Sequence, residues 1–187
     1  DSRTRAALRE VDKNAEDLYE QADETKRLAQ EFNAANYQAG MAGNVNEKWK
    51  SITGTQNEIS ILKTRFNKII NAAVMDGLPP GAASDKDIEL AQQGFPDDSY
   101  PPEMIASYLA GMQKLSYIAA EKENERLKFL RANNGSPAMI NKETNQVVTF
   151  NDHWSSKIQN PEFINYLEEK TKLDFMDANE RKAYDET

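Results

Sequence analysis

The sequence predicts a mainly α-helical protein, in which a long helical hairpin or bundle is followed by a small β-hairpin and short C-terminal helices. Apolar residues recur at helical spacing over three long stretches, Pro- and Gly-rich segments separate these stretches, and a single pair of β-like runs follows them. We expect three regions: a helical hairpin over 1–76, a loop with a short helix and a third long helix packing on it over 77–135, and the small hairpin with short helices over 136–187.

The first helical stretch, residues 2–35, carries a seam of mostly small residues. The seam residues alternate at spacings of three and four: Leu8, Val11, Ala15, Leu18, Ala22, Thr25, Ala29 and Phe32. This heptad-like pattern predicts a long amphipathic helix. Because the seam offers few large side chains, the helix needs a partner to be stable.

The second stretch, residues 45–76, is the expected partner of the first helix. A short turn containing Gly40 and Gly43 connects the two stretches, which favours an antiparallel helical hairpin. Tyr19, Leu28 and Ala35 lie off the seam and are expected to contact a second chain. From the first helix we select Leu18 and Leu28 as candidate partner contacts.

A Pro- and Gly-rich break, Leu78-Pro79-Pro80-Gly81, ends the second helix. Ser84 is a good N-cap for a short helix over 85–93, and Gly94 is a suitable C-terminal stop with Phe95 as its hydrophobic contact. The segment 78–96 is therefore a candidate contact surface, with Leu78, Pro79, Pro80 and Phe95 as its contact residues. A simple connector between helices is the alternative.

The third long helix is expected from Pro102 to about Asn133, where Asn134-Gly135 supplies a stop. Two short β-like runs within 138–150 predict a small hairpin, which must lean on the helices or on another chain. Short helices over 152–159 and 161–172 follow, and 174–187 is expected to form a further helical piece or a tail.

The residue inventory argues against an enzyme. The chain has no cysteine, which excludes disulfides, thiolate metal sites and cysteine nucleophiles. Its one histidine, His153, is a candidate general base, but we expect a helix-start residue packed beside Trp154. Acidic runs such as Glu121, Glu123 and Glu125 are expected to be solvated. We predict no catalytic residue, no cofactor, no bound metal and no small-molecule substrate.

The charge distribution argues against tight DNA binding. The net charge is −8, whereas a protein that holds duplex DNA by its phosphates normally has a basic excess. Residues 47–70 carry five basic and two acidic residues, a local net charge of +3. We interpret this stretch as a solvated helix face and predict weak or no direct DNA binding.

Three runs carry a resemblance to a known family: LPPGAASDKDI at 78–88, GFP at 94–96 and MIASYLAGMQKL at 104–115. They resemble the internal virion proteins of short-tailed bacteriophages and related prophages that transfer, or eject, DNA. The resemblance covers residues 62–135 and contains no catalytic signature.

The resemblance implies a protein packaged inside the capsid and expelled with the genome to the host cell envelope. There it would assemble with copies of itself or with other virion proteins into a conduit for DNA, in possible contact with the envelope. A generic helical adaptor or scaffold protein is the alternative. The sequence begins at Asp1 within a helical pattern, so we expect a processed chain or part of a longer protein.

Overall fold

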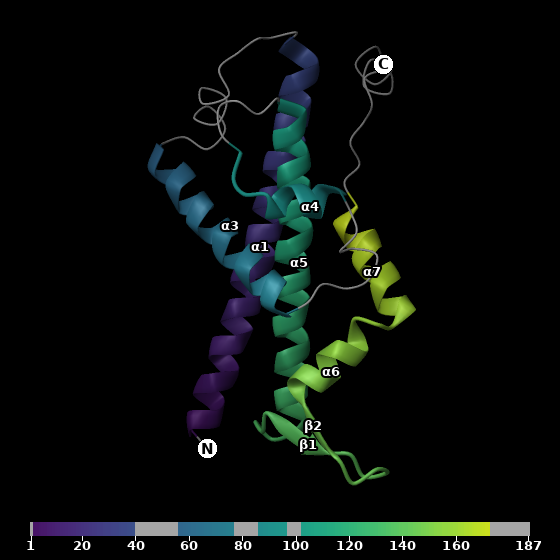
Figure 1. The fold of residues 1–187 in the computed structure, drawn as a ribbon. Coiled ribbons are helices and arrows are strands. Elements are labelled where there is room, and N and C mark those ends of the chain that lie inside the picture. The colour runs from purple at the N-terminus through teal and green to yellow at the C-terminus, as the bar shows by residue number, and fades with distance from the viewer. Residues whose placement is uncertain (1, 40–55, 77–85, 97–101, 173–187) are drawn as a thin grey trace, which may run out of the picture.

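The computed structural model describes residues 2–39, 56–76, 86–96 and 102–172 and confirms a mainly helical fold (Figure 1). The helices are α1 (Ser2–Ala39), α3 (Gln56–Asp76), α4 (Lys86–Gln92), α5 (Pro102–Ala132), α6 (Phe150–Lys157) and α7 (Pro161–Thr171), and the strands are β1 (Ala138–Ile140) and β2 (Val147–Thr149). Within the described residues, no helix is both long and apolar enough to span a bilayer.

The two longest helices, α1 and α5, run antiparallel and form the axis of the molecule (Figure 1). Asp12 near the start of α1 pairs with Arg131 at the end of α5 at 3.7 Å. Further along α1, the Tyr19 hydroxyl donates to Glu121 of α5 at 2.7 Å. The predicted seam forms this contact, because its described members are buried or half-buried: Leu8, Val11, Ala15, Leu18, Ala22, Thr25 and Ala29.

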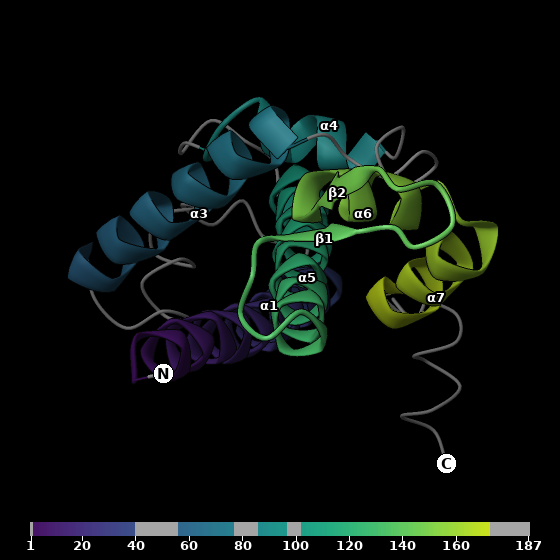
Figure 2. The ribbon, with the colours of Figure 1, turned by 90° about the horizontal axis from the view of Figure 1, so that it is seen from below.

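The main partner of α1 is therefore α5, not the helix of the predicted 45–76 hairpin. The physical reason is that α5 is mostly apolar from Met104 to Ala120, so this helix can receive neighbours on several sides. Every residue from Ile105 to Glu125 is accordingly buried or half-buried. Figure 2 shows α5 at the centre with the other helices around it. Residues 45–55 lie outside the described part of the chain.

Helices α3 and α4 complete the largest core around the first half of α5. Phe66 of α3 lies 5.9 Å from Tyr108 of α5 and 6.3 Å from Phe95, measured between ring centroids. Gly94 ends α4 as predicted, and its φ of +108° turns the chain so that Phe95 faces this core. The predicted Ser84 N-cap lies outside the described residues.

The C-terminal elements form in their predicted order and pack on the second half of α5, but α6 begins at Phe150, two residues earlier than predicted, and takes this residue from the predicted hairpin. Strands β1 and β2 pair antiparallel, with Ile140 opposite Val147. Thr149 ends β2 and also caps α6 in a capping box with Asp152. One apolar cluster joins α6 and α7 to α5, formed by Ile118, Phe129, Phe150, Trp154, Ile158, Phe163 and Leu167.

Candidate functional site

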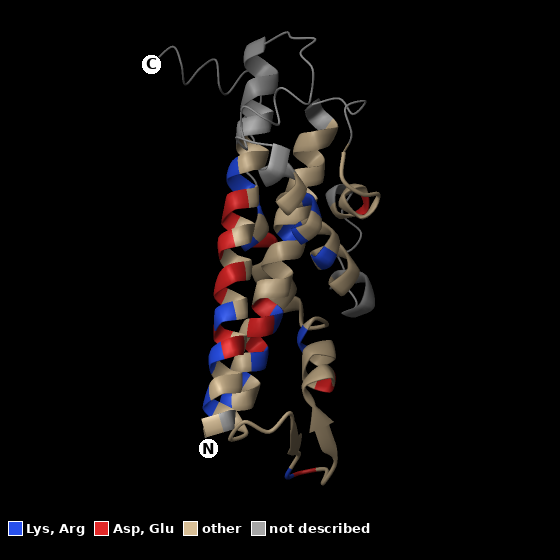
Figure 3. Ribbon diagram, turned by 90° about the vertical axis from the view of Figure 1, so that its left-hand side faces the viewer, with Lys and Arg blue, Asp and Glu red and all other residues tan. Residues whose placement is uncertain are grey.

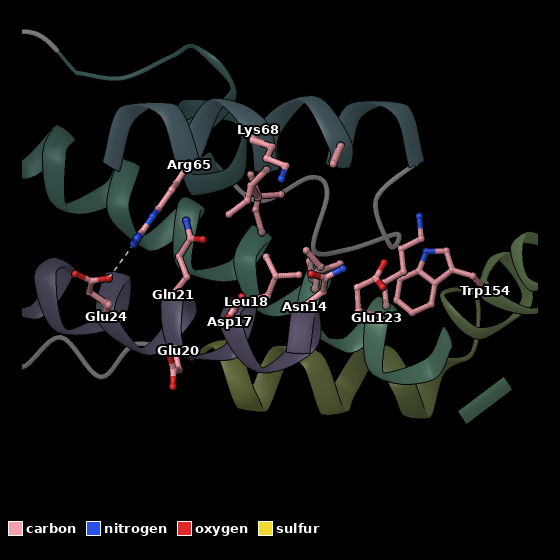
Figure 4. Close-up of a pocket in the computed structure, with 16 residues that line it drawn as sticks. Asn14, Asp17, Leu18, Glu20, Gln21, Glu24, Arg65, Lys68, Glu123 and Trp154 are labelled. Carbon is pink, nitrogen blue, oxygen red and sulfur yellow. Dashed lines mark ion pairs between the residues drawn. The ribbon is translucent and has the colours of Figure 1, made fainter. Parts of the chain in front are cut away.

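A groove of about 610 Å³ lies between α1 and α3 (Figure 4). Helix α5 contributes residues between these two walls, and Trp154 of α6 lies at one end. The apolar part of the lining includes Leu18, Ile69, Leu115 and Ile118. An apolar surface framed by polar side chains is the common composition of a binding groove.

The two walls of this groove carry opposite charges. Asp17 and Glu24 line it from α1, whereas Arg65 and Lys68 line it from α3. Arg65 and Glu24 form an ion pair between the two helices, with 3.8 Å between the charged atoms (Figure 4). Both side chains of this pair are about half exposed, so the pair stabilises the fold little and can exchange partners.

Three buried polar atoms of residues lining this groove lack a hydrogen-bond partner in the described structure: Gln21 Nε2, Glu123 Oε2 and Trp154 Nε1. The Trp154 side chain is only 3% exposed. A buried polar group without a partner costs about 1–3 kcal/mol, so a molecule that supplies the missing hydrogen bonds gains affinity. All three atoms are shielded from solvent, so a molecule in the groove would reach them only if the side chains turned.

A second polar feature surrounds Glu121, a carboxylate of α5 that is 4% exposed. Its Oε1 accepts hydrogen bonds from Tyr19 of α1 at 2.7 Å and from Tyr166 of α7 at 2.9 Å. The Tyr117 and Tyr166 hydroxyl groups lie 3.1 Å apart. This tyrosine–glutamate cluster (Tyr19, Tyr117, Tyr166 and Glu121) therefore ties three helices together through one carboxylate.

The pKa values of all three tyrosines in this cluster are raised, which favours the protonated hydroxyl group. Burial, together with the hydrogen bond to Glu121, raises the pKa of Tyr19 far above its ordinary value. Burial and the Tyr166 contact raise the pKa of Tyr117 in the same way. Burial also raises the pKa of Tyr166. All three hydroxyl groups are thus protonated at neutral pH, so Tyr19 and Tyr166 donate to the carboxylate, and Tyr117 can donate to the Tyr166 hydroxyl.

Glu125, one turn beyond Glu121, binds three basic side chains. Its carboxylate lies 2.7 Å from Lys128 Nζ and 3.5 Å from both Lys157 Nζ and His153 Nε2. Burial alone would raise the pKa of Glu125, but Lys128, Lys157 and His153 outweigh it and lower the pKa below its ordinary value. Glu125 therefore joins α5 to α6 as an ionised carboxylate.

Two predictions about these residues were wrong. Glu121 and Glu125 are not solvated, since their exposures are 4% and 6%. His153 lies near the start of α6, as predicted, but its ring packs against Phe129 and Phe150, at centroid distances of 5.4 and 6.3 Å, rather than beside Trp154. The spacing of Leu115, Ile118, Glu125 and Phe129 along α5 was the available signal, because it places Glu125 within an apolar stripe.

The residues selected from the sequence are not brought together in one place. Leu18 is half-buried and lines the groove. Leu28 is 2% exposed in the chain's own core, so its predicted contact with a second chain is wrong. Phe95 packs on Phe66 and Tyr108, beneath Lys63. Leu78, Pro79 and Pro80 lie outside the described residues.

Tyr19 also differs from its predicted role as a free contact, because its hydroxyl group binds Glu121 within the chain. The side chain of Ala35 lies outside the described part. Among the described residues, no three Asp, Glu, His or Cys side chains are grouped so that they could hold a metal ion.

Comparison of this chain with protein-family models, with curated proteins and with solved structures finds no match. Its function is therefore argued from its own residues.

Proposed function

We propose that this chain is a non-catalytic assembly component of a bacteriophage virion, of the kind that leaves the capsid and helps to form a conduit for DNA across the host envelope. The resemblance of residues 62–135 to internal virion proteins supports the virion setting. The groove between α1 and α3 supports a role in binding another polypeptide.

The binding role rests on where the buried polar groups lie: some hold the helices together, and others belong to residues that line the groove. The buried carboxylates Glu121 and Glu125 hold helices together and are enclosed by tyrosine or basic side chains. The partnerless atoms of Gln21, Glu123 and Trp154 instead belong to residues that line one groove. This arrangement suits recognition of a partner chain better than proton transfer to a substrate.

Direct DNA binding is expected to be weak. In the described part of the basic stretch, Arg65 pairs with Glu24 and the Lys63 ammonium group lies over the Phe95 ring. These contacts leave few cations for phosphates, and the net charge of −8 opposes association at long range. The proposed partners are copies of this chain and other virion proteins, with the host envelope as the place of delivery.

The test is quantitative mass spectrometry of virions purified from the phage or prophage that encodes the chain, before and after ejection is triggered. The chain is expected in intact virions and is expected to be lost from ejected particles. Its absence from intact virions would contradict the proposal and favour a generic helical adaptor.

A matched pair of variants tests the groove itself. Ala72 is exposed and lines the groove, so Ala72→Arg should obstruct it without disturbing the core. Ala132, exposed at the end of α5 and outside the groove, provides the control Ala132→Arg. Loss of virion incorporation or of ejection in the first variant alone is expected. Equal behaviour of the two variants would remove the groove from the proposal.

A further inference from the structure

The solvent-facing side of α1 carries a stripe of six charged residues in two blocks. Their spacing of three or four residues places them on one face of the helix, and all six are exposed. The basic block lies toward the start of α1 and the acidic block follows it (Figure 3). This charge stripe consists of Arg5, Arg9, Lys13, Glu16, Glu20 and Asp23.

Within one chain, each block of the charge stripe repels itself. Arg5, Arg9 and Lys13 follow one another at spacings of four, and Glu16 and Glu20 have the same spacing. Like charges four residues apart destabilise a helix. Among the described residues, none of the six forms an ion pair within the chain. Repulsion within each block, relieved where Lys13 meets Glu16 three residues further on, leaves the stripe open to a partner of opposite pattern.

A second copy of the same stripe, turned antiparallel, has that pattern. In such a pair, Lys13 faces Glu16 and Arg9 faces Glu20, and both pairs share a centre between Asn14 and Ala15. Arg5 faces Asp23 about nearly the same centre. One two-fold axis therefore matches all six charges of one copy with opposite charges of the other.

The position of the stripe on α1 leaves room for this second helix. Val11, Ala15 and Ala22 on the seam of α1 are buried, and Val11 packs with Leu127 and Leu130 of α5. Asp17 and Glu24 line the groove toward α3. Glu20 also lines this groove at its edge, but its side chain points away from α3 in Figure 4. The stripe thus lies on a face that the described helices do not cover.

We propose that two copies of this chain associate through an antiparallel contact between their α1 charge stripes. The contact is electrostatic, because the stripe contains no apolar side chain, so association is weak and falls as salt is added. This inference does not depend on the proposed virion role, because it concerns the purified chain alone.

Charge reversal tests the proposal with the whole chain. Sedimentation at about 50 mM and at about 500 mM salt, between which screening rises strongly, compares the wild type with R5E/R9E/K13E and with E16K/E20K/D23K. The wild type should self-associate at low salt, and the apparent dissociation constant should rise about tenfold or more at high salt or in either variant alone. An equimolar mixture of the two variants should associate again.

A control variant separates the stripe from overall charge. E143K/E168K/E169K makes the same change in net charge as E16K/E20K/D23K, but at exposed positions of the hairpin and α7, and it should associate as the wild type does. Circular dichroism with equal helix content shows that the variants are folded. A monomeric wild type at low salt, unchanged association of both stripe variants, or a mixture that fails to associate would each overturn the proposal.

The orientation is tested by cross-linking, since the chain has no cysteine of its own. Chains with Arg9→Cys and chains with Glu20→Cys should form a mixed disulfide with each other under mild oxidation. A parallel contact would instead cross-link Arg9→Cys chains among themselves, and that result would overturn the antiparallel arrangement.

Discussion

Individual tyrosines show how the same side chain can stabilise or strain a fold, depending on its hydroxyl partner. Tyr19 donates to the buried carboxylate of Glu121, whereas the Tyr108 hydroxyl is buried without a partner among the described residues. A hydrogen bond to a charged group contributes about 1.5–3 kcal/mol, and an unpaired buried hydroxyl costs free energy. Removing the hydroxyl group should therefore have different effects on stability at Tyr19 and at Tyr108.

Tyr19→Phe should lower the free energy of unfolding by about 1.5 kcal/mol, at the lower end of this range because Tyr166 still donates to Glu121. Tyr108→Phe should leave that free energy unchanged or raise it, since it removes a buried polar atom that has no partner. Urea unfolding followed by circular dichroism measures both. Similar losses in the two variants would contradict this account of the tyrosine–glutamate cluster.

Glu125 gives the fold a defined dependence on acid. Its basic neighbours lower its pKa in the folded state, so its contribution is present above the pKa of an unfolded glutamate, near 4.3. That contribution is lost as the pH falls through the lowered folded pKa. Glu125→Gln should therefore lose less stability than the wild type between about pH 5 and pH 3. Parallel stability curves over this range would count against the role of Glu125.

Single elements were largely predictable from local sequence. Pro102 begins α5, Pro161 follows the Asn160 cap of α7, and Gly94 ends α4. Asn134 and Gly135 adopt positive φ angles after α5, as the predicted stop requires. These signals act on the backbone within a few residues, so tertiary packing does not alter them.

The capping box at the start of α6 can be tested by substituting Thr149. The Thr149 hydroxyl accepts from the Asp152 amide, and the Asp152 carboxylate accepts from the Thr149 amide and hydroxyl. These hydrogen bonds also lower the pKa of Asp152. Thr149→Val keeps the β-branched shape that suits β2 but removes the cap, and it should cost about 1 kcal/mol. Thr149→Ser keeps the hydroxyl and should cost less in thermal unfolding; equal losses would contradict a capping role.

The pairing of helices across the whole molecule was not predictable from periodicity. The seam of α1 indicates that it needs a partner, but its small residues fit α3 and α5 equally well. The choice depends on α5 being mostly apolar from Met104 to Ala120 and on polar contacts over long sequence separation, such as Tyr19 with Glu121. The groove was missed for the same reason, because its residues come from α1, α3, α5 and α6.

The start of α1 packs closely against the turn that follows α5, and this contact can be tested at Gly135. Gly135 has a φ of +84°, and a Cβ at this position would overlap the Thr4 side chain near the start of α1. Gly135→Ala should therefore suffer both backbone strain, about 1–2 kcal/mol, and a steric conflict with α1. Thr4→Ala removes the methyl group that causes this conflict.

Gly94 is the matched control, because its φ is also positive, at +108°, but a Cβ there would meet nothing within 4 Å. Thr4→Ala should recover part of the stability lost in Gly135→Ala, with a coupling of about 0.5 kcal/mol or more, and should recover none in Gly94→Ala. Urea unfolding of the wild type, the three single variants and the two double variants measures this coupling. Additive effects at both glycines would mean that the start of α1 does not pack against the end of α5 in solution.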